Sequence, residues 1–153
     1  MNTLISNTPQ WIKKTIRKLR TFSFRSFLLK RRLHKSGSCL KINWKGVEIK
    51  NPRYISIGDH VYINKHVELL AAPNMDKQPE LIIGSNVHFG KYNCIGCSNK
   101  IVIGDHVLFA PYVHITDRNH AFEDIHTPIW LQPTTSSGPV IIGGGHGSVS
   151  EPR

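Results

Sequence analysis

The sequence predicts an all-β domain in which the chain winds as a coil of short strands, preceded by one basic amphipathic helix. Three observations support this prediction. Similar extended segments begin at Ile55, Leu81 and Ile101. Large apolar residues recur every six residues inside each segment, the kind of internal repeat that marks a stacked architecture. Ten of the twenty Lys and Arg residues fall between Lys13 and Lys35.

Length and composition limit the architecture. A chain of 153 residues is typical of one domain. The formal net charge is +10, and no Asp or Glu precedes Glu48, so the excess charge lies in the N-terminal segment. No stretch reaches the apolar length of a membrane span, and the N-terminus lacks the apolar core and cleavage site of a secretory signal. We therefore expect a cytoplasmic protein.

The three cysteines do not predict a disulfide framework, because their number is odd. Cys94 and Cys97 form a C-x-x-C pattern, but it lacks the second pair of a zinc site and the helix start of a redox site. We interpret both as small residues in a strand turn, in keeping with a reducing compartment.

The spacing of apolar residues between positions 9 and 35 predicts an amphipathic helix. Such a basic helix lies on an anionic membrane surface, or docks on its own domain with its charges in water. Nucleic acid is a weaker alternative, because no known binding motif accompanies the charge. The positions that recur near helical spacing, all apolar except Thr15, are Trp11, Ile12, Thr15, Ile16, Leu19 and Phe22, followed less regularly by Phe27 and Leu28.

The repeated segments predict the coil. Each has Ile-Gly near its start, and a fourth start, VIIGGG, begins at Val140. A step of six residues with one large apolar residue fits a short strand and a corner, so three steps close one triangular turn with these residues stacked inside. Gly, Asn and Asp tolerate the backbone angles of tight corners. We expect His60 and His106 at outward corners. The expected interior residues are Ile57, Ile63, Leu69, Ile83, Phe89, Ile95, Ile103, Phe109 and Ile115.

A polar stretch, TDRNHAFEDIHTPI, interrupts this pattern after Ile115. The Ile-Gly-Asp-His-Val repeats, this stretch and the restart GPVIIG together resemble the hexapeptide-repeat acyltransferases, over roughly Asn51 to Gly143. The resemblance is greatest to the maltose, galactoside and capsule O-acetyltransferase branch. It implies a left-handed parallel β-helix and acetyl-CoA as the donor substrate. It also implies a homotrimer with sites between subunits and a catalytic histidine at His120.

The residue type suits this chemistry. Transfer of an acetyl group from a thioester to a sugar hydroxyl requires removal of the hydroxyl proton, and a neutral imidazole is a natural general base at neutral pH. Asp117 and Asn119 would orient the ring or hold the shape of the loop. His126 is interpreted as structural or substrate-lining, and Trp130 as a residue that packs the loop on the body or stacks on a sugar. His114, His120 and His126 are six apart, but a metal site is not expected because the loop interrupts the coil.

The acceptor positions depart from the family. The galactoside and maltose enzymes carry an Asn and an Asp that bind the sugar, and Gly90 and Ser98 stand there in this chain. A polysaccharide or lipid-linked glycan precursor is therefore expected as the acceptor. Ser98 remains a candidate substrate contact, and the acetyl-CoA contacts are not assigned.

The C-terminal residues also depart from the family. The family continues the restart with further coils, whereas this chain ends shortly after Gly145. We expect a truncated chain that binds acetyl-CoA weakly, with a non-catalytic remnant or scaffold as one alternative and a nucleotide-sugar N-acyltransferase as another. The expected organisation is a helical segment at residues 1–40, a β-helix at 41–145 with its catalytic loop at 116–139, and an irregular tail at 146–153.

Overall fold

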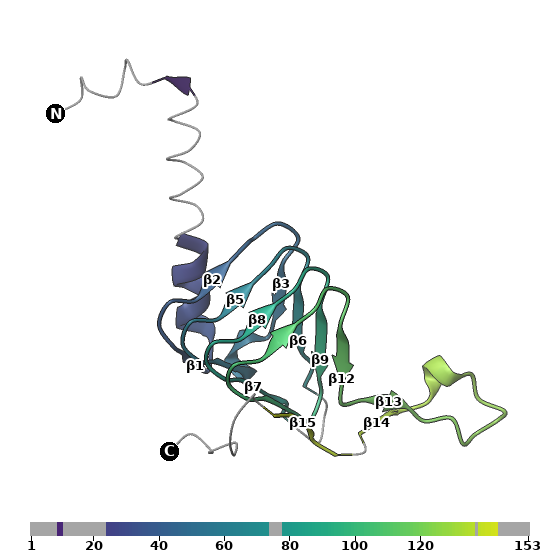
Figure 1. Cartoon of the computed structure of the whole chain (residues 1–153). Helices are drawn as coiled ribbons and strands as arrows, with labels where there is room; N and C mark the ends of the chain where they lie inside the picture. The colour runs from purple at the N-terminus through teal and green to yellow at the C-terminus, as the bar shows by residue number, and fades with distance from the viewer. Residues whose placement is uncertain (1–8, 11–23, 74–77, 137, 144–153) are drawn as a thin grey trace.

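A computed structural model describes residues 9–10, 24–73, 78–136 and 138–143. Successive strands of the main body belong in turn to three parallel sheets, so the chain winds as a three-sided coil (Figure 1). Each strand pairs in register with the strand one turn later. The predicted left-handed parallel β-helix is confirmed.

The first sheet has the most strands. It includes the predicted restart at Val140, which pairs in parallel with Ile101. Its strands, in order across the sheet, are β1 (Lys35–Ser36), β4 (Ile55–Ile57), β7 (Glu80–Ile83), β10 (Lys100–Ile103) and β15 (Val140–Ile142).

The second and third sheets form the other two sides of the coil (Figure 1). A 3-10 turn, η1 (Pro52–Tyr54), leads from the third sheet back to the first. The second sheet contains β2 (Lys41–Ile42), β5 (Tyr62–Ile63), β8 (His88–Phe89) and β11 (Leu108–Phe109). The third contains β3 (Glu48–Lys50), β6 (Glu68–Ala71), β9 (Cys94–Cys97) and β12 (His114–Thr116). The remaining elements, β13 (Asn119–His120), η2 (Ile129–Leu131) and β14 (Thr134–Thr135), lie in the loop.

The core fills the inside of the coil with the residues that the six-residue period predicts. Eight of the nine expected interior residues are buried, and Ile115 is partly buried against the same cluster. Phe89 and Phe109 stack one coil apart, with ring centroids 5.1 Å apart. Complete burial of each such side chain contributes roughly 1.5–3 kcal/mol, so the stacked interior is the main source of stability.

Close packing between coils, rather than an unusual backbone angle, explains the Ile-Gly glycines. Gly58 and Gly84 do not have positive φ, but a Cβ on either would lie 2.7 Å from the backbone of the next coil. The positive φ angles occur instead at corner residues such as His60 (56°), Tyr92 (61°) and His106 (61°). The expectation that Gly, Asn and Asp supply these angles holds in part, because Gly46, Asn51 and Asn86 have positive φ, whereas no Asp among the described residues does. The outward corner positions of His60 and His106 are confirmed.

The N-terminal helix closes one end of the coil. Residues 24–32 are helical, and Leu29 and Leu33 are buried in the same cluster as the coil interior. Trp44 donates a hydrogen bond from Nε1 to Ser26 Oγ (3.1 Å), and the Arg25 guanidinium lies 4.6 Å from the centre of the Trp44 ring. The helix therefore docks on its own domain and shields the first coil from water.

The apolar residues predicted for the helix are only partly accounted for. Phe27 and Leu28 are exposed, so the buried positions are not the predicted ones. The positions from Trp11 to Phe22 lie outside the described residues. Within the described ranges, no helix is both long and apolar enough to cross a bilayer. The coil begins at β1 (Lys35–Ser36), before the predicted start at residue 41. This earlier start was not predicted because both residues of the strand are polar.

Candidate active site

The loop at residues 116–139 leaves the coil where β12 ends and projects from the body (Figure 1). Its stem is a two-stranded antiparallel hairpin in which His120 on β13 faces Thr134 on β14. The backbone N–H of Ala121 donates to the carbonyl of Pro133 (2.9 Å), which extends the stem by one bond. The hairpin therefore presents His120 away from the coil on a defined backbone.

Asp117 anchors the base of this loop to the coil. Its side chain is buried, and its two carboxylate oxygens accept hydrogen bonds from the backbone N–H groups of Ser98 and Asn99, both at 2.8 Å. The Cys97 thiol donates to the same carboxylate at 3.6 Å. Because the carboxylate is bonded to these three donors, it holds the first residues of the loop against the coil. Asp117 therefore has a structural contact that defines the start of the loop.

The His120 side chain is exposed. Among the described residues, neither Asp117 nor Asn119 is hydrogen-bonded to its ring. The His120 imidazole lies beyond the end of β12 and is accessible to a substrate. The imidazoles of His60 and His106 instead occupy regular corner positions of the coil. The predicted general base, His120, thus lies in the loop that interrupts the repeat.

A second cluster of hydrogen bonds shapes the far part of the loop. The Asp124 carboxylate accepts from the backbone N–H of His126 (2.9 Å) and from the Thr127 hydroxyl (2.6 Å). These bonds hold the pKa of Asp124 below its ordinary value, with the Thr127 hydroxyl as the largest cause. The buried Gln132 donates from Nε2 to the carbonyls of Asp124 and Thr127, both at 2.8 Å. His126 therefore lies in an ordered turn.

Gln132 is a residue of the loop that its sequence did not predict to be important. Its burial has no local sequence signal, because the two carbonyls that it binds come from a turn whose path the sequence does not reveal. Asp124 has a weak signal, since Asp often begins a turn by accepting a hydrogen bond from the backbone two residues on, here from His126.

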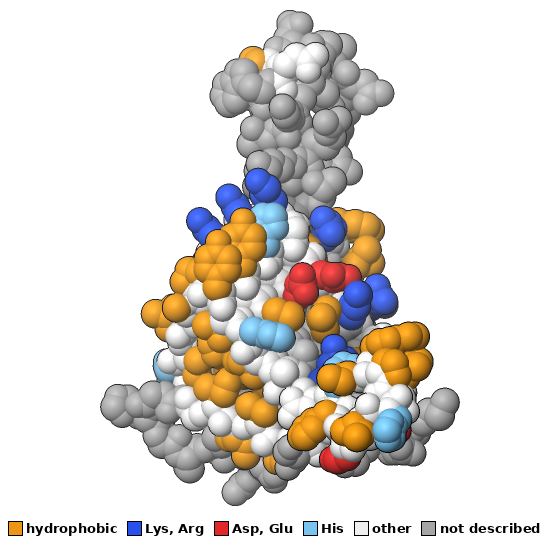
Figure 2. Space-filling model, turned by 90° about the vertical axis from the view of Figure 1, so that its right-hand side faces the viewer, with side chains coloured by type: hydrophobic (Ala, Val, Ile, Leu, Met, Phe, Trp, Pro, Cys, Tyr) orange, Lys and Arg blue, Asp and Glu red, His pale blue; other side chains and the backbone are white. Residues whose placement is uncertain are grey.

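The loop exposes its large hydrophobic side chains. The expectation that residues 128–130 pack the loop on the body is not met in the single chain, because Ile129 and Trp130 are 58% and 77% exposed. Figure 2 shows hydrophobic side chains gathered on this side of the domain. The loop therefore offers an apolar surface beside His120. The exposed large hydrophobic residues of the loop are Phe122, Ile125, Ile129, Trp130 and Leu131.

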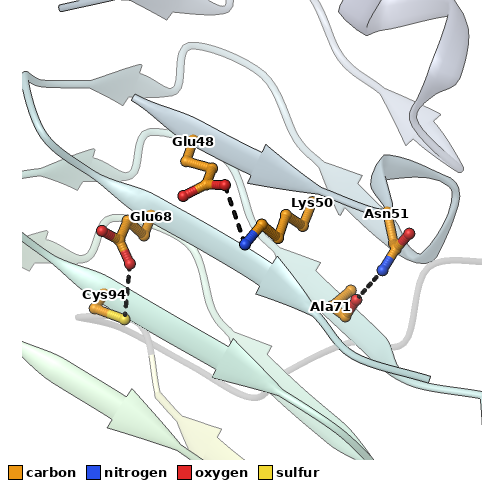
Figure 3. Close-up of polar contacts among 6 residues, drawn as sticks. All are labelled: Glu48, Lys50, Asn51, Glu68, Ala71 and Cys94. Atoms are coloured by element: carbon orange, nitrogen blue, oxygen red, sulfur yellow. Dashed lines mark hydrogen bonds and ion pairs between the residues drawn. The ribbon is translucent and has the colours of Figure 1, made fainter. Parts of the chain in front are cut away.

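The outer face of the third sheet lies next to the loop and carries charged residues. Glu48 forms an ion pair with Lys50 (3.1 Å), and the Cys94 thiol donates to Glu68 (3.7 Å), as Figure 3 shows. In register, Glu48, Glu68, Cys94 and His114 occupy one line across the strands. Burial, followed by the charge of Glu68, raises the pKa of the Cys94 thiol. That thiol is therefore protonated at neutral pH and not activated as a nucleophile.

Gly90 and Ser98, where the sequence departs from the enzymes that it resembles, lie in different environments. Ser98 is buried and donates its backbone N–H to Asp117. Gly90 is also buried, and a Cβ there would lie 2.7 Å from the backbone of Ala110 and Pro111. An asparagine at position 90 would not fit without movement of the next coil. No group of three or more His, Cys, Asp or Glu side chains in the described part of the chain is arranged to hold a metal ion.

Comparison with known proteins adds two similarities. The chain is 33% identical over 120 residues to a Mycobacterium tuberculosis protein named "Probable acetyltransferase Rv3034c". That match covers 65% of this chain and 39% of the relative, so the chain spans well under half of its length. The fold is similar to a crystal structure of mutant AntD, an N-acyltransferase from Bacillus cereus in complex with dTDP and Coenzyme A. The TM-score is 0.59 at 20% identity, covering 78% of this chain and 62% of that one. No protein-family model matches the chain.

Proposed function

We propose that this protein is an acyltransferase that moves an acetyl group from acetyl-CoA to a sugar hydroxyl, with His120 as the general base. The observation that carries the proposal is the position of His120 on a loop that is anchored by Asp117 and projects from an otherwise regular β-helix. The similarity to a protein named as an acetyltransferase supports acyl transfer as the reaction class.

The chemistry requires one base and two aligned substrates. The neutral imidazole of His120 removes the proton from the acceptor hydroxyl as its oxygen attacks the thioester carbonyl. The carbon–sulfur bond then breaks, and the imidazolium returns the proton to the departing thiolate. General base catalysis contributes roughly 10²–10⁴-fold, and holding the two substrates side by side supplies much of the remaining rate enhancement. The step therefore needs no acyl-enzyme intermediate.

The acceptor that we propose is a surface polysaccharide or a lipid-linked glycan precursor. The steric limit at Gly90 supports this choice, because the asparagine with which related enzymes bind a small free sugar would not fit there. Trp130 and His126, both exposed on the loop, are candidate acceptor contacts.

Assembly and location form part of the proposal. A homotrimer would cover the exposed apolar residues of the loop with a neighbouring copy and place His120 between subunits. Phe24, Phe27 and Leu28 are exposed on the basic helix, which supports peripheral attachment to the inner face of the cytoplasmic membrane. Light scattering tests the trimer, and co-sedimentation with phosphatidylglycerol vesicles tests the attachment, with Phe24→Ser/Phe27→Ser as the variant expected to remain in solution.

The identity of the product tests the activity. Purified protein is incubated with acetyl-CoA and either a neutral oligosaccharide or a nucleotide-linked amino sugar, and thiol release is followed. We expect an ester, which hydroxylamine cleaves, on the oligosaccharide. A hydroxylamine-stable amide on the amino sugar would favour the N-acyltransferase alternative. Absence of thiol release with either acceptor would favour the non-catalytic scaffold.

A further inference from the structure

The corner between the second and third sheets carries an ordered column of aromatic rings. The rings of His66 and Tyr92 are 4.7 Å apart and those of Tyr92 and Tyr112 are 5.0 Å apart, each pair within 4° of parallel. All three residues have positive φ, between 56° and 63°, which directs their side chains outward from the same place in successive coils. Tyr112 is 75% exposed. The column is therefore a repeated feature of the surface.

A column of lysines runs beside these rings. Lys45, Lys65 and Lys91 occupy equivalent places in three successive coils, because each accepts a backbone hydrogen bond from the aromatic-column position of the next coil, at 2.9, 3.2 and 3.0 Å. None of the three forms an ion pair with a carboxylate of the described residues. The carboxylates of the adjacent sheet contact Lys50 and Cys94 instead. We name the three lysines and the three rings the basic corner.

The sequence keeps negative charge away from this side of the molecule. Four acid-free segments form the second sheet and its corner: residues 39–47, 60–67, 86–93 and 106–113. Equivalent places in neighbouring coils are about 4.8 Å apart, so the like charges repel one another with little compensation inside the chain. An anionic ligand would relieve this repulsion.

Two hollows lie along the second sheet, and the second of them reaches the basic corner at Lys91. One, of about 280 Å³, is lined by Lys41, Tyr62 and His88, and the other, of about 410 Å³, by His88, Gly90 and Lys91. His88 lines both, and its ring lies 4.7 Å from that of Tyr62. The two hollows share His88, and the second brings the sheet surface up to Lys91 of the basic corner.

We propose that the basic corner and these hollows bind an acidic glycan, a sugar chain that carries carboxylate or phosphate groups. A ligand extended across the coils would meet one lysine per coil and the hydroxyl edges of the tyrosines. The inference rests on the proposed glycan acceptor for its choice of ligand. It adds that the acceptor is anionic and that its binding surface extends beyond the loop.

The ring geometry favours a glycan over other anionic polymers. Single-stranded nucleic acid binds through bases that stack on exposed aromatic faces. In the basic corner the faces between neighbouring rings are covered by stacking, so ring edges and hydroxyl groups are what the column presents at each coil. A membrane surface is met by a helix with an apolar face, whereas this side of the domain is a hollowed sheet with lysines along its border.

Binding to defined glycans tests the inference. Calorimetry on the full chain would compare polygalacturonate and phosphomannan fragments with neutral dextran fragments of similar length, at low and high salt. We expect binding of one or both acidic chains, weakened by salt, and no comparable binding of dextran. Lys65→Gln/Lys91→Gln should weaken the affinity about tenfold, with each lysine contributing roughly half a decade. The matched control, Lys35→Gln/Lys100→Gln, removes the same charge from the first sheet and should leave the affinity unchanged.

Several results would overturn the inference: equal affinity for dextran, an equal loss in the control variant, or tighter binding of a single-stranded oligonucleotide or of anionic vesicles at this surface. The test is independent of turnover. If acidic chains bind but no acetyl transfer occurs, the proposed function fails and the binding surface stands. If a neutral acceptor is acetylated and no acidic chain binds, only this inference fails.

Discussion

The β-helix and the loop at residues 116–139 differ in where they place their large hydrophobic residues. In the β-helix, Ile63 and Ile95 are completely buried, whereas in the loop Ile125 and Trp130 are 87% and 77% exposed. Asp117 joins the two regions through its bonds to the backbone of the coil. The comparison teaches that stability resides in the repeated coil, and that the loop is free to carry residues chosen for contacts with other molecules.

The largest expected difference in stability is between a side-chain truncation in the coil and one in the loop. Phe89→Ala removes a ring that stacks inside the coil and should lower the free energy of unfolding by roughly 3–5 kcal/mol. Trp130→Ala removes an exposed ring and should change it by no more than about 0.5 kcal/mol. Urea unfolding followed by circular dichroism measures both. Similar losses in the two variants would show that the loop is part of the folding core.

Removal of the Asp117 carboxylate should have an intermediate effect. Asp117→Ala leaves the backbone N–H groups of Ser98 and Asn99 without their acceptor, at a cost of roughly 1–3 kcal/mol. Hydrogen exchange at these two amides should accelerate, while Asn119→Ala, at an exposed neighbouring position, should leave them unchanged. Unchanged exchange in Asp117→Ala would show that the loop is held by other contacts.

A pair of glycine substitutions separates the two roles of the coil corners. Gly84→Ala places a Cβ against the backbone of the next coil and should destabilise the fold by roughly 1–3 kcal/mol. His106→Gly relieves a positive φ at an exposed corner and should stabilise it by about 0.5–1 kcal/mol. Thermal unfolding reports the signs. If both substitutions changed the stability in the same direction, either Gly84 would not be a site of close packing or His106 would not be a site of backbone strain.

The smallest effect concerns thiol reactivity. Burial, together with the charge of Asp117, raises the pKa of the Cys97 thiol to about 12, so this group stays protonated at pH 8. Alkylation by iodoacetamide should modify the exposed Cys39 first and Cys97 last. Mass spectrometry after timed labelling checks the order. Early modification of Cys97 in folded protein would mean that the base of the loop opens readily.

The coil was predictable because its signal is repeated. Ile57, Ile83 and Ile103 recur at the same place in three segments, and only an architecture in which equivalent residues stack inside explains that recurrence. The reason for the Ile-Gly glycines was not predictable, since the contact of Gly84 with Gly104 requires knowing which backbones lie against each other. The identity of the positive-φ residues was predictable only in part, because asparagine and histidine favour this conformation, as at Asn86 and His106, whereas tyrosine does not, as at Tyr92.

The candidate site was predictable in its position more than in its contacts. The interruption of the repeat located the loop and His120, because so polar a stretch lacks the apolar residues that a regular coil places in its interior. The partners of Asp117 were not evident, since Ser98 and Asn99 lie one coil away and are brought to it only by the register of β9 and β12. The exposure of Trp130 was missed because a tryptophan side chain is on average largely buried.

The most direct test of the central claim is the effect of His120→Ala on thiol release from acetyl-CoA in the presence of the acceptor, measured together with urea unfolding of the same protein. The account predicts a rate loss of roughly 10²–10⁴-fold with an unchanged unfolding midpoint. A variant that retains the wild-type rate would contradict the role of His120 as the base, and a variant that loses rate and stability together would contradict the separation of coil and loop.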